Sequence, residues 1–269
     1  MSTITRRTLL AGAAGAGGLA LTSGLALAGC RGPDAPDVAV RSGSLRSGHW
    51  SGRDIHWQLA QQTQDVTTPA PLVVVLHGKG GDATHAFRIM KLEEHVRSAG
   101  VTLASVDGGD YYWHARRGGV DTGAMVVEDF LPLMRRETGY EGKVAFLGWS
   151  MGGYGSLLLA SELGPDQVFA VVAESAALWT APGLSAAGAF DDREDFEAHD
   201  VFERTDVLSK IPVRMDCGRS DPFVAGNRAF GKVLPSAELT FDKGGHTAEY
   251  WTSHGGPQLE WVREQYDRQ

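Results

Sequence analysis

One serine stands between glycines where an apolar segment gives way to a helical one, and it is the residue of this chain best placed to do chemistry. Residues 148–152 read Gly-Trp-Ser-Met-Gly, which fits the pattern G-x-S-x-G. The preceding VAFLG is typical of a strand and the following GGYGSLLLA of a helix. A sharp strand-to-helix turn exposes the hydroxyl, and flanking glycines leave room for a crowded backbone. We therefore predict that Ser150 is a nucleophile.

Two later segments supply the partners that such a serine needs. In IPVRMDCGRSDPF, Asp221 lies just past a strand, and in LTFDKGGHTAEYW, His246 lies in a glycine-rich loop after the last strand. A histidine there can take the serine proton, while the carboxylate holds the imidazole in the correct tautomer. Glu174, at the end of the preceding strand, is the alternative acid, and His254 is the alternative base.

A second glycine-rich loop follows the apolar segment PLVVVL as HGKGG, residues 77–81. Such a loop can turn a backbone N–H toward an oxyanion that forms near the serine. We predict that Met151, the residue after the nucleophile, and Lys79 provide the two N–H donors. Gly80 is the alternative to Lys79.

Aromatic residues gather on segments that should border the serine. DGGDYYWHARRGG follows a strand that ends at Val106, and a tryptophan precedes Ser150. An apolar or ring-shaped part of a substrate would suit such a rim, and Arg116 and Arg117 could meet an anionic group. The alternative is that these aromatic residues only pack the loops. The predicted substrate-binding residues are Trp113, Trp149, Tyr112 and Trp179.

The elements that must position these residues alternate between strand and helix. In HWSGRDIHWQLA, the apolar residues Ile55, Trp57 and Leu59 alternate with polar ones behind a Ser-Gly turn, which predicts an antiparallel hairpin. Short, continuously apolar strands follow, with helices between them, so we predict a mostly parallel sheet with helices on both faces. The predicted strands are 71–77, 101–106, 143–148, 168–174, 211–217 and 237–242. The predicted helices lie near 84–98, 122–138, 151–163, 223–233 and 257–267.

Composition limits the classes of partner. The chain has 269 residues and a formal net charge of -8, with 33 acidic and 25 basic residues. Nucleic acid is excluded as a partner, since phosphate binding needs a concentrated basic surface. No Cys/His cluster has zinc spacing, and the nine histidines are scattered, so no metal site is predicted.

The first thirty residues read as an export signal. A twin arginine, Arg6-Arg7, precedes an uncharged Ala/Gly/Leu-rich stretch that ends at Leu27-Ala28-Gly29-Cys30. This pattern resembles a bacterial twin-arginine signal with a lipobox, and cleavage before Cys30 would leave a lipidated cysteine that anchors the protein to a membrane outside the cytoplasm. A plain cleaved signal for secretion and a retained membrane anchor are the alternatives.

The domain organisation follows from this reading of the N-terminus. We predict a signal over residues 1–29, a flexible tether over 30–42 and a single domain over 43–269, with a small excursion at about 175–205. Cys217 would be the one cysteine left in the domain, so we expect no intrachain disulfide and a small packed side chain there.

Residues from about 43 to 267 resemble an α/β-hydrolase of the esterase branch that includes esterase D-like enzymes, and more distantly the secreted mycolyltransferases. The resemblance rests on LHGKGG, GWSMGG, GRSDPF and GGH. It implies the α/β-hydrolase fold, with the order Ser, Asp, His, and acyl transfer through an acyl-Ser150 intermediate with no cofactor.

Three functions follow from these expectations. The first is an exported serine carboxylesterase acting on a small-molecule or cell-envelope ester. The second is an envelope acyltransferase in which a sugar hydroxyl replaces water. The third is a non-catalytic envelope binding protein on the same scaffold, although a binding protein has no need of all three residues. A peptidase is less favoured, because the short stretch before Asp221 leaves little room for a large specificity domain.

Overall fold

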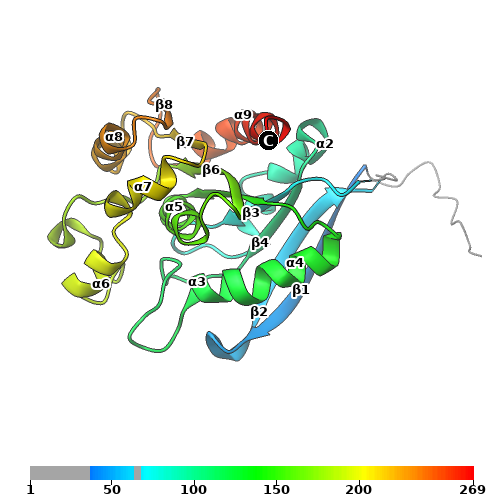
Figure 1. Ribbon diagram of the computed structural model, residues 1–269, viewed down its shortest axis with the longest axis horizontal. Coiled ribbons are helices and arrows are strands. Elements are labelled where there is room, and N and C mark those ends of the chain that lie inside the picture. The colour runs from blue at the N-terminus through cyan, green and yellow to red at the C-terminus, as the bar shows by residue number, and fades with distance from the viewer. Residues whose placement is uncertain (1–36, 64–67) are drawn as a thin grey trace, which may run out of the picture. The chain divides into compact units, whose positions relative to one another are not determined.

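An eight-stranded sheet organises the chain in this computed structural model, which describes residues 37–63 and 68–269 (Figure 1). The strand order is β1-β2-β4-β3-β5-β6-β7-β8. The first two strands pair antiparallel, β2 pairs antiparallel with β4, and every later pair is parallel. The strands are β1 (Val38–Ser47), β2 (Trp50–Gln62), β3 (Leu72–Leu76), β4 (Thr102–Val106), β5 (Val144–Trp149), β6 (Val168–Glu174), β7 (Val213–Asp216) and β8 (Glu238–Thr240).

The burial of the strands matches the patterns that predicted them. All residues of β3, β4, β5 and β6 are buried, as strands covered on both faces require. In β2, Ile55, Trp57 and Leu59 are buried, while the residues between them are exposed or half-buried. The predicted hairpin and the mostly parallel sheet are therefore both present.

Helices cover both faces of the sheet and enclose two hydrophobic cores. Figure 1 shows α3, α4 and α5 on one side and α2 and α9 on the other. One core contains Phe130, Leu158 and Phe230 from the first side, and the second contains Val96 and Leu259 from the other. The helices are α1 (His85–Arg88), α2 (Val96–Ala99), α3 (Thr122–Ala124), α4 (Leu131–Thr138), α5 (Met151–Leu163), α6 (Arg193–Ala198), α7 (Thr205–Leu208), α8 (Val224–Val233) and α9 (Ala248–Asp267). Further short helices are η1 (Leu92–His95), η2 (Met125–Phe130), η3 (Pro182–Leu184) and η4 (Val201–Arg204).

Two predicted helices differ from the structure. The segment near 84–98 forms three short pieces, because Lys91 adopts a left-handed conformation with φ of 56° and interrupts it. The last helix begins at Ala248 instead of 257 and continues through Gly255 and Gly256. A Cβ on Gly255 would lie 2.7 Å from a Leu92 methyl, and one on Gly256 would lie 2.9 Å from the His95 ring. These glycines thus permit close helix packing and do not mark a helix end.

The folded domain begins earlier than predicted. Strand β1 starts at Val38, so residues 38–42 belong to the sheet and not to a tether that extends to residue 42. The predicted signal over 1–29 and Cys30 lie outside the described residues. No helix within 37–63 or 68–269 is both long enough and apolar enough to span a membrane.

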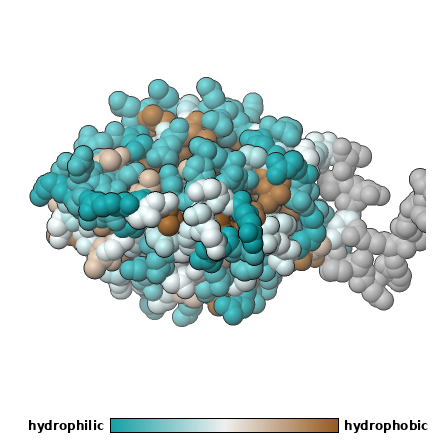
Figure 2. All heavy atoms as spheres, turned by 90° about the horizontal axis from the view of Figure 1, so that it is seen from below, coloured by the Kyte–Doolittle hydropathy of each residue, from teal (hydrophilic) through white to brown (hydrophobic). Residues whose placement is uncertain are grey.

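The excursion after β6 forms a small layer, which we call the lid segment, residues 178–204. It contains η3, α6 and η4 and extends away from the sheet in the yellow-green part of Figure 1. Figure 2 shows a face of the molecule that is largely hydrophilic, with hydrophobic residues in separate small patches. Scattered exposed apolar residues of this kind are normal for a protein surface.

Candidate active site

Ser150 occupies the strained turn that its flanking glycines predicted. It lies between the end of β5 and the start of α5, with φ of 57° and ψ of -119°, a conformation that few residues other than glycine adopt. Its N–H donates to Glu174 O at 2.9 Å, which holds the turn against β6. A Cβ on Gly152 would lie 1.9 Å from Leu76 O, so α5 can approach β3 only with glycine there. This close packing places the serine at the carboxyl end of the sheet.

The structure brings Ser150, His246 and Asp221 together as a hydrogen-bonded chain. Ser150 Oγ lies 2.9 Å from His246 Nε2, and His246 Nδ1 lies 2.9 Å from Asp221 Oδ2. The Asp221 side chain is fully buried, and its other oxygen accepts the Phe223 N–H at 2.8 Å. With Nδ1–H donating to the carboxylate, Nε2 presents its lone pair to the serine hydroxyl. This arrangement can remove a proton from Oγ and return it to a leaving group.

Aromatic rings hold the His246 side chain in place. The Trp251 ring meets the His246 ring edge-on at 4.8 Å, and Phe223 meets it at 5.2 Å. Trp251 is itself fixed, because its Nε1–H donates to Ser175 Oγ at 3.0 Å. Sequence reasoning missed both rings, although Phe223 lies two residues after Asp221 and Trp251 lies five after His246. The short sequence distance of these two rings from Asp221 and His246 was the signal that could have predicted the contacts.

The alternative acid and base lie apart from the serine. Glu174 is fully buried behind the turn, and its nearest histidine is His254, whose Nδ1 is 3.8 Å from Glu174 Oε1. Burial, followed by the nearby Asp216 carboxylate, raises the pKa of Glu174 well above its usual value. His254 pairs with Asp242 at 3.2 Å. Neither Glu174 nor His254 takes part in the hydrogen-bonded series Ser150–His246–Asp221.

The glycine-rich loop 77–81 lies directly against the serine. A Cβ on Gly78 would lie 3.3 Å from Ser150 Cβ. The N–H of Gly80 is taken, since it donates to Asp110 Oδ1 at 2.6 Å. The Lys79 N–H has no hydrogen-bond partner in the part of the chain that the structure describes. The Met151 N–H belongs to the first turn of α5, where no carbonyl of the helix can accept it.

His77 stabilises the loop 77–81 through hydrogen bonds of its ring, a role that sequence reasoning missed. Its Nε2 accepts the Gly108 N–H at 2.9 Å, so the proton lies on Nδ1, which donates to Gly78 O at 2.8 Å. Burial is the main cause that lowers the pKa of His77, so the ring remains neutral at pH 7. The imidazole thus ties the loop after β3 to the loop after β4.

Two of the four predicted substrate-binding residues are buried away from any rim. Trp113 is fully buried and packs against Gly108 and Gly155, where added Cβ atoms would lie 2.3 Å from its ring. In this structure the Trp113 ring packs into the core, whereas the prediction placed it against a substrate, and its backbone has a positive φ of 61°. Trp149 is 5% exposed and packs between Gly78 and Trp251.

The other two predicted residues belong to a cluster of rings that reaches the histidine. Tyr112 is buried and lies 5.9 Å from the partly exposed Trp179. Trp179 contacts Phe223 at 5.5 Å and Phe190 of the lid segment at 6.1 Å, and both of these rings are partly exposed. We call Trp179, Phe190 and Phe223 the aromatic wall. Because Phe223 also contacts His246, the wall runs from the triad into the lid segment.

The two predicted anion-binding arginines are already paired with acidic residues of the lid segment. Arg116 Nη2 donates to Asp191 Oδ1 at 2.8 Å, and the Arg117 guanidinium pairs with Asp192. These arginines therefore hold the lid segment to the rim loop 108–121. The structure also places His114 beside Asp195 and His199 in this region, although His114 is far from the other two in the sequence.

Three solved structures that share this architecture are α/β-hydrolases. A ferulic acid esterase matches with a TM-score of 0.74 at 19% identity, covering 85% of this chain and 99% of its own. FphF, a fluorophosphonate-binding serine hydrolase of Staphylococcus aureus, matches with a TM-score of 0.71 at 18% identity over 85% and 99%. An S-formylglutathione hydrolase from Agrobacterium tumefaciens matches with a TM-score of 0.73 at 15% identity over 85% and 96%. This chain therefore has the α/β-hydrolase fold, as its motifs predicted.

The sequence comparisons place the chain in a family. No curated protein matches the sequence. Residues 52–254 match the model of the Esterase family, described as "Putative esterase", and this range includes Ser150, Asp221 and His246. Because the match spans most of the chain, the protein belongs to this esterase family of α/β-hydrolases.

Proposed function

We propose that this protein is a serine carboxylesterase that cleaves its substrate through an acyl-Ser150 intermediate. The observation that supports this most directly is the chain of two 2.9 Å contacts, from Ser150 Oγ to His246 Nε2 and from His246 Nδ1 to Asp221 Oδ2. Each contact is within hydrogen-bond range, so the nucleophile, base and orienting acid need no rearrangement before reaction.

In the acylation step, Ser150 Oγ attacks the ester carbonyl carbon while its proton passes to His246 Nε2. The buried Asp221 carboxylate stabilises the imidazolium that forms. The C=O bond opens to an oxyanion, for which we propose the N–H groups of Met151 and Lys79 as donors. Collapse of this intermediate breaks the ester C–O bond, and His246 gives its proton to the leaving alcohol.

Deacylation reverses these roles with water as the acceptor. His246 takes a proton from water, the oxygen attacks the acyl carbon, and the released serine oxygen recovers the proton. The products are a carboxylic acid and free Ser150.

The aromatic wall favours a substrate with an apolar or ring-shaped portion. Trp179, Phe190 and Phe223 are partly exposed, and Phe223 lies beside His246. Flat apolar groups pack well against such rings, whereas Arg116 and Arg117 are occupied by lid carboxylates. We therefore propose Trp179 and Phe190, together with Phe223, as substrate contacts.

Covalent labelling with a fluorophosphonate tests the nucleophile. We expect a single adduct on the wild-type chain by intact mass, no adduct on Ser150→Ala, and full labelling of Ser220→Ala, an exposed serine beside Asp221 that serves as the control. An adduct that persists in Ser150→Ala would refute the proposed nucleophile.

Kinetics on short-chain aryl esters test the other two roles. Ser150→Ala and His246→Ala should each lower kcat on the order of a million-fold, and Asp221→Ala should cost less. Loss of activity in Glu174→Ala together with retention in Asp221→Ala would overturn the assignment of the acid. Product analysis with an added sugar acceptor distinguishes hydrolysis from acyl transfer.

We also propose that the protein is exported and held at a membrane by lipid on Cys30, which the N-terminal motif supports. The expected result is an acylated N-terminal peptide in the mature protein and loss from the membrane fraction in Cys30→Ser. A mature chain that keeps Arg6 and Arg7 would contradict this proposal.

A further inference from the structure

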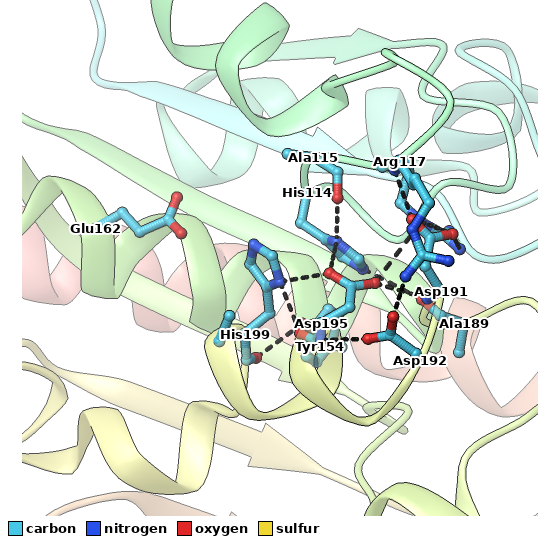
Figure 3. Close-up of polar contacts among 12 residues, drawn as sticks. His114, Ala115, Arg117, Tyr154, Glu162, Ala189, Asp191, Asp192, Asp195 and His199 are labelled. Carbon is cyan, nitrogen blue, oxygen red and sulfur yellow. Dashed lines mark hydrogen bonds and ion pairs between the residues drawn. The ribbon is translucent and has the colours of Figure 1, made fainter.

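Three potential metal ligands meet where the lid segment touches the rim loop. His114 belongs to the rim loop, while Asp195 lies on α6 and His199 follows one turn later at its end. One donor atom from each of the three lies within 4.8 Å of the others. Figure 3 shows the Asp195 carboxylate between the His114 and His199 rings, with Glu162 standing apart from them.

The surroundings of His114 leave one of its ring nitrogens without a suitable partner. Its Nε2 faces Ala189 O at 3.2 Å, and its Nδ1 faces Ala115 O at 2.9 Å and Asp195 Oδ1 at 3.6 Å. All three neighbours are acceptors, yet a neutral imidazole has a single N–H.

A cation beside Nδ1 would satisfy this nitrogen and the Asp195 carboxylate without a second N–H on the ring. Nε2–H then donates to Ala189 O, and the Nδ1 lone pair binds the metal. Metal-binding histidines commonly donate their other N–H to a backbone carbonyl in this way. His114 is nearly fully buried, so its ring is held in this orientation by its surroundings.

Asp195 is arranged as a ligand through one oxygen. Its Oδ2 accepts the Asp191 N–H at 2.7 Å and lies 4.0 Å from Arg116 Nε. Its Oδ1 faces His199 Nδ1 at 2.9 Å and His114 Nδ1 at 3.6 Å. Tetrahedral zinc with bonds of about 2.1 Å places neighbouring ligand atoms about 3.4 Å apart. The observed distances from Asp195 Oδ1 to the two Nδ1 atoms, 2.9 and 3.6 Å, lie on either side of that value.

We propose that His114, Asp195 and His199 form a Zn²⁺ site that joins the lid segment to the rim loop. Two imidazoles and one carboxylate are a ligand set that zinc accepts, and an adjoining cavity of about 240 Å³, lined by both histidines, supplies water as the fourth ligand. With zinc bound, each neutral ring would keep its proton on Nε2 and give its Nδ1 lone pair to the metal. For His199 this replaces the 2.9 Å contact that Nδ1 makes with Asp195 O. The His199 ring stacks on His114 at 4.3 Å and, being the more exposed of the two, turns to complete the coordination.

The site would influence the lid segment beside the triad. The His114 ring stacks on Phe190 of the aromatic wall at 5.3 Å with an angle of 18°. Zinc would therefore immobilise the part of the lid that carries Phe190. The binding itself does not depend on the proposed esterase function, since none of the three ligands belongs to the triad.

Calorimetric titration of the purified chain with Zn²⁺ tests the site. We expect one Zn²⁺ per chain, with a Kd that rises at least about a hundredfold in Asp195→Asn and in His199→Ala, because each loses a direct ligand. Two controls should bind zinc as the wild type does. His49→Ala removes an exposed His–Glu pair whose atoms are 2.9 Å apart, and His246→Ala removes the histidine of the triad.

Several results would overturn the proposal. These are no saturable binding by the wild type, unchanged binding by both ligand variants, or loss of binding in either control. X-ray absorption of the zinc-loaded wild type provides a second measurement if the variants fold poorly. Two imidazoles in the coordination shell support the site, whereas one imidazole indicates zinc at the triad and refutes it.

Discussion

Replacing Gly152 by alanine should damage both the fold and the reaction, because this glycine lets α5 pass against β3. An added Cβ would lie 1.9 Å from Leu76 O and 2.8 Å from His77 O, both backbone atoms of the core. Ordinary contact begins at 3.4 Å, so the helix and strand must separate by roughly 1.5 Å. Overpacking usually costs about 1–3 kcal/mol, and we expect the upper end or more because backbone cannot rotate away.

The same displacement should affect catalysis. Moving α5 away from β3 separates the Met151 N–H from the loop 77–81, and a misplacement of about 1 Å can lower a rate by about 100-fold. We therefore expect Gly152→Ala to lose at least about 3 kcal/mol of unfolding free energy and at least about 100-fold in kcat/KM. Urea denaturation and aryl ester hydrolysis measure the two effects.

Gly48→Ala provides the matched control for this prediction. Gly48 lies in the turn between β1 and β2, and nothing lies within 4 Å of an added Cβ. Its unfolding free energy should change by no more than about 0.5 kcal/mol, with unchanged activity. A Gly152→Ala protein with wild-type stability and kcat/KM would refute the argument that close packing positions the serine.

Three further predictions concern the surroundings of the triad. Trp251→Phe keeps the ring beside His246 but loses the 3.0 Å bond to Ser175, worth about 1 kcal/mol, so kcat should fall about fivefold with little change in KM. The control is Trp261→Phe, on the same helix as Trp251, which loses a 2.8 Å bond to Glu238 of β8 and should leave kcat unchanged. Equal effects of the two substitutions would contradict a positioning role for Trp251. Folding raises the pKa of Glu174, so above pH 4.5 the native chain keeps a proton on this carboxyl that the unfolded chain has lost. The free energy of unfolding should therefore fall as pH rises above 4.5, by up to about 1.4 kcal/mol per pH unit. Denaturation from pH 5 to 8 should show this slope reduced in Glu174→Gln but not in the exposed Glu264→Gln, and identical slopes would count against a buried proton. Burial raises the pKa of Cys217 to about 12, so iodoacetamide at pH 8 should modify it only after unfolding, and rapid labelling of the native chain by mass spectrometry would contradict this.

Local patterns were enough to predict the sheet and to predict that Ser150, Asp221 and His246 would lie together. The central strands β3 and β5 are continuously apolar, and β6 is apolar up to Glu174, because these strands are covered on both faces. Ser150, Asp221 and His246 each follow a strand, and parallel strands end at one edge of a sheet. Strand order therefore did not have to be known for these residues to be expected together.

The direction of side chains in loops could not be read in the same way. YYW predicted an exposed aromatic rim, but the backbone turns Trp113 into the core, where Gly108 and Gly155 make room for it. Gly108 lies in the same loop, but Gly155 lies on α5, far from Trp113 in the sequence, so the loop sequence alone does not predict the space for the ring. For the same reason the helix predicted near 257–267 starts too late, since Gly255 and Gly256 lie inside α9 and allow contact with Leu92 and His95.

The sequence by itself determined the fold class and the residues that can form the triad, because both depend on regular strands and the positions just after them. Only the tertiary structure decided the aromatic wall, the pairing of Arg116 and Arg117 with the lid segment, and the meeting of His114 with Asp195 and His199. These contacts join segments that are separated in the sequence and whose paths follow no periodic rule. Their partners are chosen by packing of the whole chain, which no single segment encodes.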